Sequence, residues 1–427
     1  MSRRVLMLAY FFPPLAGGGV HRVLSFTRHL PEAGWDCTVV CAGAEDYWVR
    51  DPSLVTRVPP ATEVLRVPGG TPLAAWMRLR GSRDETTRAR RPARGFALAR
   101  RIVDLALVPD PYVGWARRAT RVARERIARG GVDVILTSSP PDSAHLSGLE
   151  LARTTGLPWV ADFRDPWIGV HFLRPPTPWH ATRQRALERA VVAGADLVLA
   201  ASRTHLEDLQ ALSPRRLELL PNGYEPAAAV TPRRDERFTI VFTGTLFHMR
   251  QTGVFLEALA EWLARDPAAR AQVRVVLAGP FEHDQADHAR RLGLEDVVEF
   301  PGPLPHGETR ALQGGADLLL LWKPDGRGYR TMVPGKLYEY LDTGRPLLAV
   351  LHTGDEAARM AVDAGGERVD PDDRGAIARS LERRVSAWKR NGTPDGARPA
   401  WLAGHTRAAL ATRLGRLLDT LVRGQGR

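Results

Sequence analysis

The 427-residue chain has only two cysteines and no long apolar run. These two shortages argue against a disulfide-stabilised protein and against a membrane-spanning one. No apolar segment approaches the roughly 20 residues that a membrane-spanning helix needs. The first ten residues are too short and too soon interrupted to form a secretory signal. Cys37 and Cys41 lie four residues apart in one expected strand, on one face but too far apart to bridge. A reducing cytoplasm is therefore the expected compartment.

Lysine is nearly absent: Lys323, Lys336 and Lys389 accompany 57 arginines. The net charge is +12, and residues 78–129 alone hold fifteen arginines against five acids, a net of +10. Such a segment attracts an anionic membrane, a lipid-linked or nucleotide substrate, or nucleic acid. The alternative is a solvated helix surface. We do not expect the chain to bind nucleic acid, because the sequence has no zinc-binding spacing of cysteines and histidines, no RNP motif and no interleaving of basic with aromatic residues.

Short apolar runs alternate with helical patterns, which predicts an α/β protein with parallel sheets covered on both faces. The polar, Pro-containing segment 224–237 is the best linker candidate. We expect a Rossmann-like domain over 1–223, a second over 238–400, and a final helix in 401–427 that packs back on the first. The two doubly wound domains should face each other across a cleft at the carboxyl ends of their strands. Residues 68–95 should form an irregular insertion.

The expected strands lie at 5–9, 38–41, 132–136, 159–161, 197–200 and 217–220 in the first domain, and at 238–243, 273–278, 297–300, 318–322 and 347–351 in the second. The stretches between them have helical periodicity.

Two loops of the first domain carry candidate ligand groups. Gly17, Gly18 and Gly19 follow the first strand and precede a helix, where glycines let backbone N–H groups approach an anion or a sugar hydroxyl. The alternative is a mobile loop. Ser143 should cap a later helix. The dipole of that helix should keep the His145 imidazole neutral and able to bind a sugar, unless His145 is only a surface or capping residue.

A third loop, residues 162–167, follows a buried strand directly and contains two carboxylates, an arginine and a tryptophan. Such a loop can bind hydroxyl groups and stack on a sugar face. The alternative is a structural Arg164–aspartate pair that pins the loop. Asp162 or Asp165 could act as a general base, and the sequence does not choose between them.

In the second domain, Thr245 and Arg250 follow the first strand, where the planar guanidinium suits a diphosphate. Pro334 suits the first turn of a helix. Lys336 and Glu339 are three apart on that helix and therefore neighbours. A lysine near a helix start is poorly placed for the dipole, which indicates an anionic ligand, with Glu339 available for ribose hydroxyls. The alternative is a surface ion pair between the two.

The chain resembles bacterial family-4 glycosyltransferases of the GT-B fold, almost from end to end. The motifs that carry the resemblance are Pro-Pro…Gly-Gly-Gly at 13–19, Ser-Pro-Pro…His at 139–145, Asp-Phe-Arg-Asp-Pro-Trp at 162–167, Pro-Asn-Gly at 221–223, Thr-Gly-Thr…Arg at 243–250 and Pro-Gly-Lys-Leu-Tyr-Glu-Tyr-Leu at 334–341. The last motif is the most specific.

This resemblance implies a retaining transfer of a sugar from a nucleotide-sugar to a hydroxyl acceptor, in cell-surface glycan or natural-product glycoside synthesis, with no metal and no cofactor. The residues matching the family's functional positions are Arg250 and Lys336 for the diphosphate, Glu339 for the ribose, Gly18 and Gly19 for the glycine loop, and His145 for the donor sugar. The protein should be cytoplasmic, at the inner face of the membrane if 78–129 binds anionic lipid.

The chain departs from the family pattern at two positions. Thr331 stands where the family often has a glutamate that contacts the donor sugar, and Thr245 stands where an arginine often follows the glycine. Two enzymatic alternatives stay open. A metal-dependent transferase would use Asp370-Pro371-Asp372, although Asp372 or Asp373 better fits a helix start. An epimerase or hydrolase of nucleotide-sugars would share the same fold.

Overall fold

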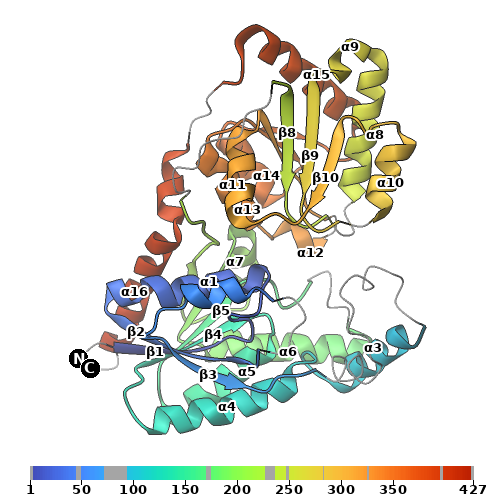
Figure 1. Cartoon of the computed structure of the whole chain (residues 1–427). Helices are drawn as coiled ribbons and strands as arrows, with labels where there is room; N and C mark the ends of the chain where they lie inside the picture. The colour runs from blue at the N-terminus through green and yellow to red at the C-terminus, as the bar shows by residue number, and fades with distance from the viewer. Residues whose placement is uncertain are drawn as a thin grey trace. The chain divides into compact units, whose positions relative to one another are not determined.

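The computed structural model describes residues 3–44, 50–71, 94–169, 175–226, 236–246, 250–281, 283–324, 327–394 and 398–424. The chain divides into two compact units (Figure 1). Unit 1 comprises Met1–Gly223 and Arg407–Arg427, and unit 2 comprises Tyr224–Thr406. Most of the expected insertion at 68–95 and of the expected linker at 224–237 lies outside the described residues.

Unit 1 is built on a seven-stranded parallel sheet in the order β3-β2-β1-β4-β5-β6-β7. Its strands are β1 (Arg3–Leu8), β2 (Trp35–Ala42), β3 (Glu63–Val67), β4 (Val134–Ser139), β5 (Trp159–Phe163), β6 (Leu197–Ala200) and β7 (Leu217–Leu219). Its helices are α1 (Gly18–His29), α3 (Arg94–Ala106), α4 (Val113–Ala128), α5 (Ser143–Thr155), α6 (Pro178–Gly194), α7 (Arg203–Gln210) and α16 (Arg407–Gly424), with short 3₁₀ turns η1 (Pro31–Ala33) and η2 (Pro52–Arg57).

Alternation along β1 explains why both faces of this sheet are covered. Val5 and Met7 point into one apolar cluster, shared with α1 and α16. Leu6 and Leu8 point into another, shared with α4 and α5. Successive side chains of a strand point to opposite faces, so the apolar run 5–8 of β1 needs helices on both faces of the sheet.

Unit 2 contains a six-stranded parallel sheet in the order β10-β9-β8-β11-β12-β13. Its strands are β8 (Phe238–Thr243), β9 (Val273–Ala278), β10 (Val298–Gly302), β11 (Leu318–Leu321), β12 (Leu347–Val350) and β13 (Glu367–Val369). Its helices are α8 (Arg250–Arg265), α9 (Pro267–Arg270), α10 (His283–Arg291), α11 (His306–Gly315), α12 (Arg327–Arg330), α13 (Gly335–Thr343), α14 (Glu356–Asp363) and α15 (Arg374–Asn391), with the 3₁₀ turn η4 (Ala400–His405).

The final helix, α16, follows unit 2 in sequence but belongs to unit 1, where it packs beside α1. Its residues Leu410, Leu414 and Leu418 are buried in the cluster that also contains Val23 and Phe26 of α1. Cys37 and Cys41 are both buried and unbridged, and burial raises the pKa of each thiol to about 12. None of the described helices combines the length and the hydropathy that a bilayer span requires.

Candidate functional site

The glycine loop of unit 1 is shaped by contact with an arginine from a distant loop. Gly17 has a φ of +105° and occupies the N-cap of α1. A Cβ added to Gly19 would lie 2.8 Å from Nη1 of Arg164. That same Nη1 donates a hydrogen bond to the carbonyl oxygen of Gly19. Gly19 is therefore required for a backbone–guanidinium contact.

Arg164 joins the loops that follow three neighbouring strands, β1, β4 and β5. Besides Gly19, its guanidinium donates to the carbonyl oxygen of Ser139 at 2.6 Å and to that of Pro140 at 3.2 Å. The sequence suggested that an arginine–aspartate ion pair holds loop 162–167 in place. Arg164 does hold this loop, but it does so by donating hydrogen bonds to backbone carbonyl oxygens.

The buried arginine–aspartate pair of this edge instead joins Arg22 to Asp162. Arg22 donates to both carboxylate oxygens at 2.9 and 2.7 Å, and both side chains are almost fully buried. Ser138 Oγ also donates to this carboxylate at 2.9 Å. The prediction that Asp162 could act as a general base is therefore wrong, because its buried carboxylate accepts hydrogen bonds from Arg22 and Ser138 that hold the loops together.

Asp165, the other candidate base, is half-buried and makes no hydrogen bond to any described residue. Burial raises the pKa of its carboxyl, and the nearby Arg164 and Arg22 oppose that rise. The carboxylate therefore keeps free acceptor positions at the carboxyl edge of the sheet.

His145 lies in the first turn of α5 and is fully buried. Its Nδ1 is 2.7 Å from Thr137 Oγ1, and its ring centroid is 4.3 Å from that of Phe163. Its Nε2 has no hydrogen-bond partner within the described part of the chain. Burial lowers the pKa of the imidazole to about 3, so the ring is neutral, for a reason other than the helix dipole that the sequence suggested.

Ser143 does not cap α5, contrary to the sequence-based expectation. Asp142 occupies the N-cap position without a side-chain cap bond. The carboxylate of Asp110, far away in sequence, accepts hydrogen bonds from Ser143 N at 2.7 Å and from Ser143 Oγ at 2.9 Å. A buried acid outside the helix thus takes the role that a local serine usually fills.

In unit 2, Lys336 lies at the carboxyl edge of the sheet. It is the second residue of α13, and its Nζ is 3.8 Å from the ring centroid of Phe242, near the end of β8. Nζ makes neither an ion pair nor a hydrogen bond with the residues that the structure describes. Burial lowers the pKa of this ammonium to about 7, although the charge of Glu339 opposes the shift. The surface ion pair considered from the sequence is therefore absent between these two described residues.

One glycine makes room for Lys336, and a second glycine makes room for the first. Gly244 has a φ of +129°, and a Cβ there would lie 2.5 Å from Lys336 Nζ. Gly279 has a φ of +138°, and a Cβ there would collide with the carbonyl oxygen of Gly244. The Thr-Gly-Thr motif after β8 is thus a spatial partner of the Pro-Gly-Lys motif, 92 positions away.

The other predicted residues of unit 2 lie around this edge. Arg250 begins α8 and forms an ion pair with Asp372 at 2.8 Å. Thr245 is exposed, and Glu339 is half-buried. Pro334 occupies the N-cap of α13 and not its first turn, a correction of one position. Phe247, His248 and Met249, which belong to the same motif as Arg250, lie outside the described residues.

Sequence reasoning missed the role of Lys323. This buried lysine follows β11, forms an ion pair with Asp355 at 2.8 Å, and donates to the carbonyl oxygens of Tyr329 and Met332. It therefore holds the loop that precedes Lys336. That loop also contains Thr331, whose hydroxyl is buried with no partner among the described residues. The scarcity of lysine in the sequence could have drawn attention to Lys323, because it is one of only three lysines.

Tyr340 was also missed, although it lies inside the most specific motif. Its buried hydroxyl accepts a hydrogen bond from Thr243 N at 2.8 Å, and Gln313 Nε2 donates to Thr243 Oγ1 at 2.8 Å. Burial raises the pKa of the phenol. Tyr340 thereby fixes the end of β8 immediately before Gly244.

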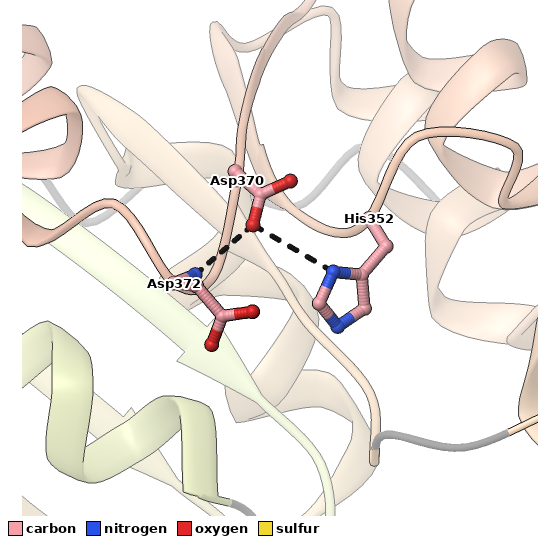
Figure 2. Close-up of side chains that lie close together, drawn as sticks. All are labelled: His352, Asp370 and Asp372. Atoms are coloured by element: carbon pink, nitrogen blue, oxygen red, sulfur yellow. Dashed lines mark hydrogen bonds and ion pairs between the residues drawn. The ribbon is translucent and has the colours of Figure 1, made fainter.

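One group of described side chains could hold a metal ion: His352, Asp370 and Asp372 (Figure 2). Their ligand atoms lie within 4.8 Å of one another. Asp370 Oδ1 is 3.6 Å from His352 Nδ1 and accepts a hydrogen bond from Asp372 N at 3.1 Å. Arg368 pairs with Asp370 at 3.5 Å, and Arg250 pairs with Asp372. Two guanidinium groups thus compete with a cation for both carboxylates.

The expectation that an aspartate here starts a helix is confirmed for Asp373. It is the N-cap of α15, and its carboxylate accepts a hydrogen bond from Ala376 N at 2.8 Å.

Comparison with known proteins identifies the family to which the chain belongs. The sequence model of Glycosyltransferase Family 4 matches residues 16–228. The chain belongs to glycosyltransferase family 4. The matched region contains the glycine loop, His145 and Asp165, so the resemblance inferred from the motifs is confirmed.

A curated relative is also a glycosyltransferase. The Putative colanic acid biosynthesis glycosyltransferase WcaL of Escherichia coli (strain K12) is 29% identical over 157 residues, which is 36% of this chain and 37% of that protein. The chain thus aligns with little more than a third of this curated relative.

Solved structures match over nearly the whole chain and establish the GT-B fold, two Rossmann-like α/β units. Sucrose-phosphate synthase from Thermosynechococcus elongatus has a TM-score of 0.65 at 18% identity, covering 99% of this chain and 100% of that one. HepE of Anabaena, solved in complex with UDP-glucose, has a TM-score of 0.54 at 16% identity, covering 99% and 97%.

Proposed function

We propose that the chain transfers a sugar from a nucleotide-diphosphate-sugar to a hydroxyl acceptor, with retention of configuration and without a metal ion. The observation that carries this proposal is the unpaired Lys336 ammonium at the carboxyl edge of unit 2, held beside Gly244 in a chain of glycosyltransferase family 4. Ligands of open α/β sheets bind outside the carboxyl ends of the strands. The UDP-glucose complex of HepE supports a nucleotide-sugar as the donor class.

The proposed reaction depends on how the site stabilises the charges that develop as the donor bond breaks. As the bond between sugar C1 and the diphosphate oxygen breaks, negative charge grows on the leaving phosphate and positive charge on the sugar. Lys336 and Arg250 stabilise the phosphate charge, and the partial desolvation of Lys336 strengthens its share. Arg250 must exchange Asp372 for the phosphate. Glu339 binds the ribose hydroxyls.

The acceptor oxygen then bonds to C1 on the face that the phosphate leaves. Its proton passes to the departing phosphate oxygen, so the atoms balance and no protein nucleophile is needed. His145 Nε2, which has no hydrogen-bond partner among the described residues, would contact the donor sugar. The glycine loop would approach the same sugar through its backbone N–H groups. Asp165, with free acceptor positions, would orient the acceptor hydroxyl. A lipid-linked glycan or a soluble natural product would serve as acceptor in the cytoplasm.

A panel of nucleotide-sugars scored by thermal shift tests the donor. A true donor at about 100 Kd adds roughly 2.7 kcal/mol of stability. The configuration of the product, read by proton NMR, tests retention. Incubation with the donor alone separates transfer from epimerisation or hydrolysis, because only the latter two consume it.

Treatment with EDTA tests the metal-independent mechanism. Full activity in EDTA is expected. Activity that is lost in EDTA and restored by a divalent cation would contradict it, and His352→Ala would then show whether the Figure 2 cluster holds that cation.

A further inference from the structure

Three large apolar side chains lie exposed together on helix α3 of unit 1. Within the described chain, the exposed large apolar side chains are Val55, Leu98, Ile102, Leu105, Trp179 and Val362. Leu98, Ile102 and Leu105 belong to α3, at spacings of four and seven, so they form one stripe on the helix surface. Leu98 is 62% exposed and Ile102 57%, so no other described element covers this stripe.

Trp179 extends the stripe from the neighbouring helix. It is the second residue of α6 and is 64% exposed. The next residue, His180, donates from Nε2 to the carbonyl oxygen of Leu105 at 3.1 Å. This bond joins the start of α6 to the last turn of α3, as Figure 1 also shows for the two helices. Leu98, Ile102, Leu105 and Trp179 are called the α3–α6 patch below.

The charge around the patch is positive. Arg100 and Arg101 are exposed on α3. Arg101 directly precedes Ile102 and flanks the stripe, whereas Arg100 lies nearer the opposite side and pairs weakly with Asp104 at 3.8 Å. The described residues 94–129, which include α3, contain nine arginines against three acids. An apolar stripe with flanking arginines and a tryptophan at its end suits the interfacial layer of a bilayer.

We propose that the α3–α6 patch inserts into the headgroup region of an anionic lipid bilayer and anchors unit 1 there. Leucine, isoleucine and indole side chains would enter the acyl boundary, while the arginines would remain among the phosphates. A second copy of the chain is the weaker occupant. A stable protein interface needs about 20–30 residues a side, and the patch offers four side chains beside concentrated positive charge, which repels an identical surface.

The test is co-sedimentation of the full chain with vesicles, without donor or acceptor. One set contains phosphatidylcholine and phosphatidylglycerol, and the other phosphatidylcholine alone. The chain should bind the anionic set more tightly. Leu98→Ser with Ile102→Ser should weaken binding about tenfold, and Trp179→Ser should weaken it similarly. Arg101→Glu should weaken binding to the anionic set only.

The matched controls are Val55→Ser in η2 and Val362→Ser in unit 2, exposed apolar side chains that do not belong to the patch, and both variants should bind like the unaltered chain. Equal binding to both vesicle sets, or patch variants that bind normally, would overturn the proposal. So would sedimentation velocity showing that patch variants abolish a dimer instead. Because no turnover is measured, failure here would leave the proposed transferase function untouched, and failure of transfer would leave this result untouched.

Discussion

Lys336 is half-buried, and its ammonium has no ion-pair or hydrogen-bond partner among the described residues, so its protonation should govern donor affinity. Its pKa of about 7 means that the free protein loses this charge as pH rises through 7. A diphosphate binds the charged form, so binding takes up a proton above that pH. Donor affinity should therefore be constant below pH 7 and fall by up to about tenfold per unit above it.

Calorimetry with the best nucleotide-sugar of the panel, whose diphosphate does not titrate in this range, measures this dependence. Lys336→Arg is the control, because a guanidinium stays charged throughout and should flatten the profile. A profile for the unaltered chain that is flat between pH 6 and 9 would show that Lys336 is not the titrating group.

Gly244 should be as sensitive as the lysine that it accommodates. In Gly244→Ala, the new Cβ would lie 2.5 Å from Lys336 Nζ on a backbone with φ of +129°. The lysine must move, and we expect the KM for the donor to rise by about tenfold, or about 1.4 kcal/mol. Gly354→Ala is the matched control, since Gly354 also has a positive φ but no atom within 4 Å of the new Cβ. Equal effects in both variants would indicate backbone strain alone.

At the scale of elements, the loop between β11 and α13 depends on a buried ion pair. Lys323→Met removes the ammonium that donates to two carbonyl oxygens of the loop, and it leaves Asp355 buried without its cation. Removing one partner of such a pair typically costs about 3–5 kcal/mol. Urea unfolding should show a loss of this size.

The double variant Lys323→Met/Asp355→Asn separates charge from packing. Asparagine can still accept the cap bond from Ala357 N, so the double variant should recover part of the loss. A double variant as unstable as the single one would mean that the carbonyl bonds of Lys323, and not the buried charge, dominate.

Which elements the sequence predicted, and which it missed, follows from burial. The interior strands were predicted because runs such as 318–321 and 347–350 are wholly apolar. The edge strands β7 and β10 were predicted, but the edge strands β3 and β13 were missed, because Glu63–Val67 and Glu367–Val369 are short, charged and only partly buried. An edge strand has one neighbour, so its sequence carries a weaker apolar signal.

The candidate site could be predicted as motifs but not as contacts. The order of motifs led to the family, and each motif lies at the end of a strand. The partners did not follow from spacing: Arg22 with Asp162, Lys336 with Gly244, and Asp110 with Ser143 come from segments far apart in the chain. Only the sheet order brings them together.

At the scale of the whole molecule, unit 1 needs the end of the chain. Leu414 of α16 is fully buried against α1 and the sheet. Leu414→Ala should cost about 2–5 kcal/mol in the unfolding of unit 1. Donor binding to unit 2 should persist under native conditions, because α16 belongs to the other unit.

Limited proteolysis followed by mass spectrometry distinguishes the two units in this variant. Cleavage should appear first within 1–223. Earlier cleavage within 224–406 would contradict the assignment of α16 to unit 1.

Lys336 is the proposed cation that binds the donor diphosphate, and isothermal titration of the full chain with the identified nucleotide-sugar tests this role most directly. Lys336→Ala is compared with Lys389→Ala, an exposed lysine of the same unit. Lys389→Ala should bind the donor with unchanged affinity. Lys336→Ala should lose most of its donor affinity, and its turnover should be lower by about 10²–10³-fold. Equal affinity and turnover in the two folded variants would contradict this role.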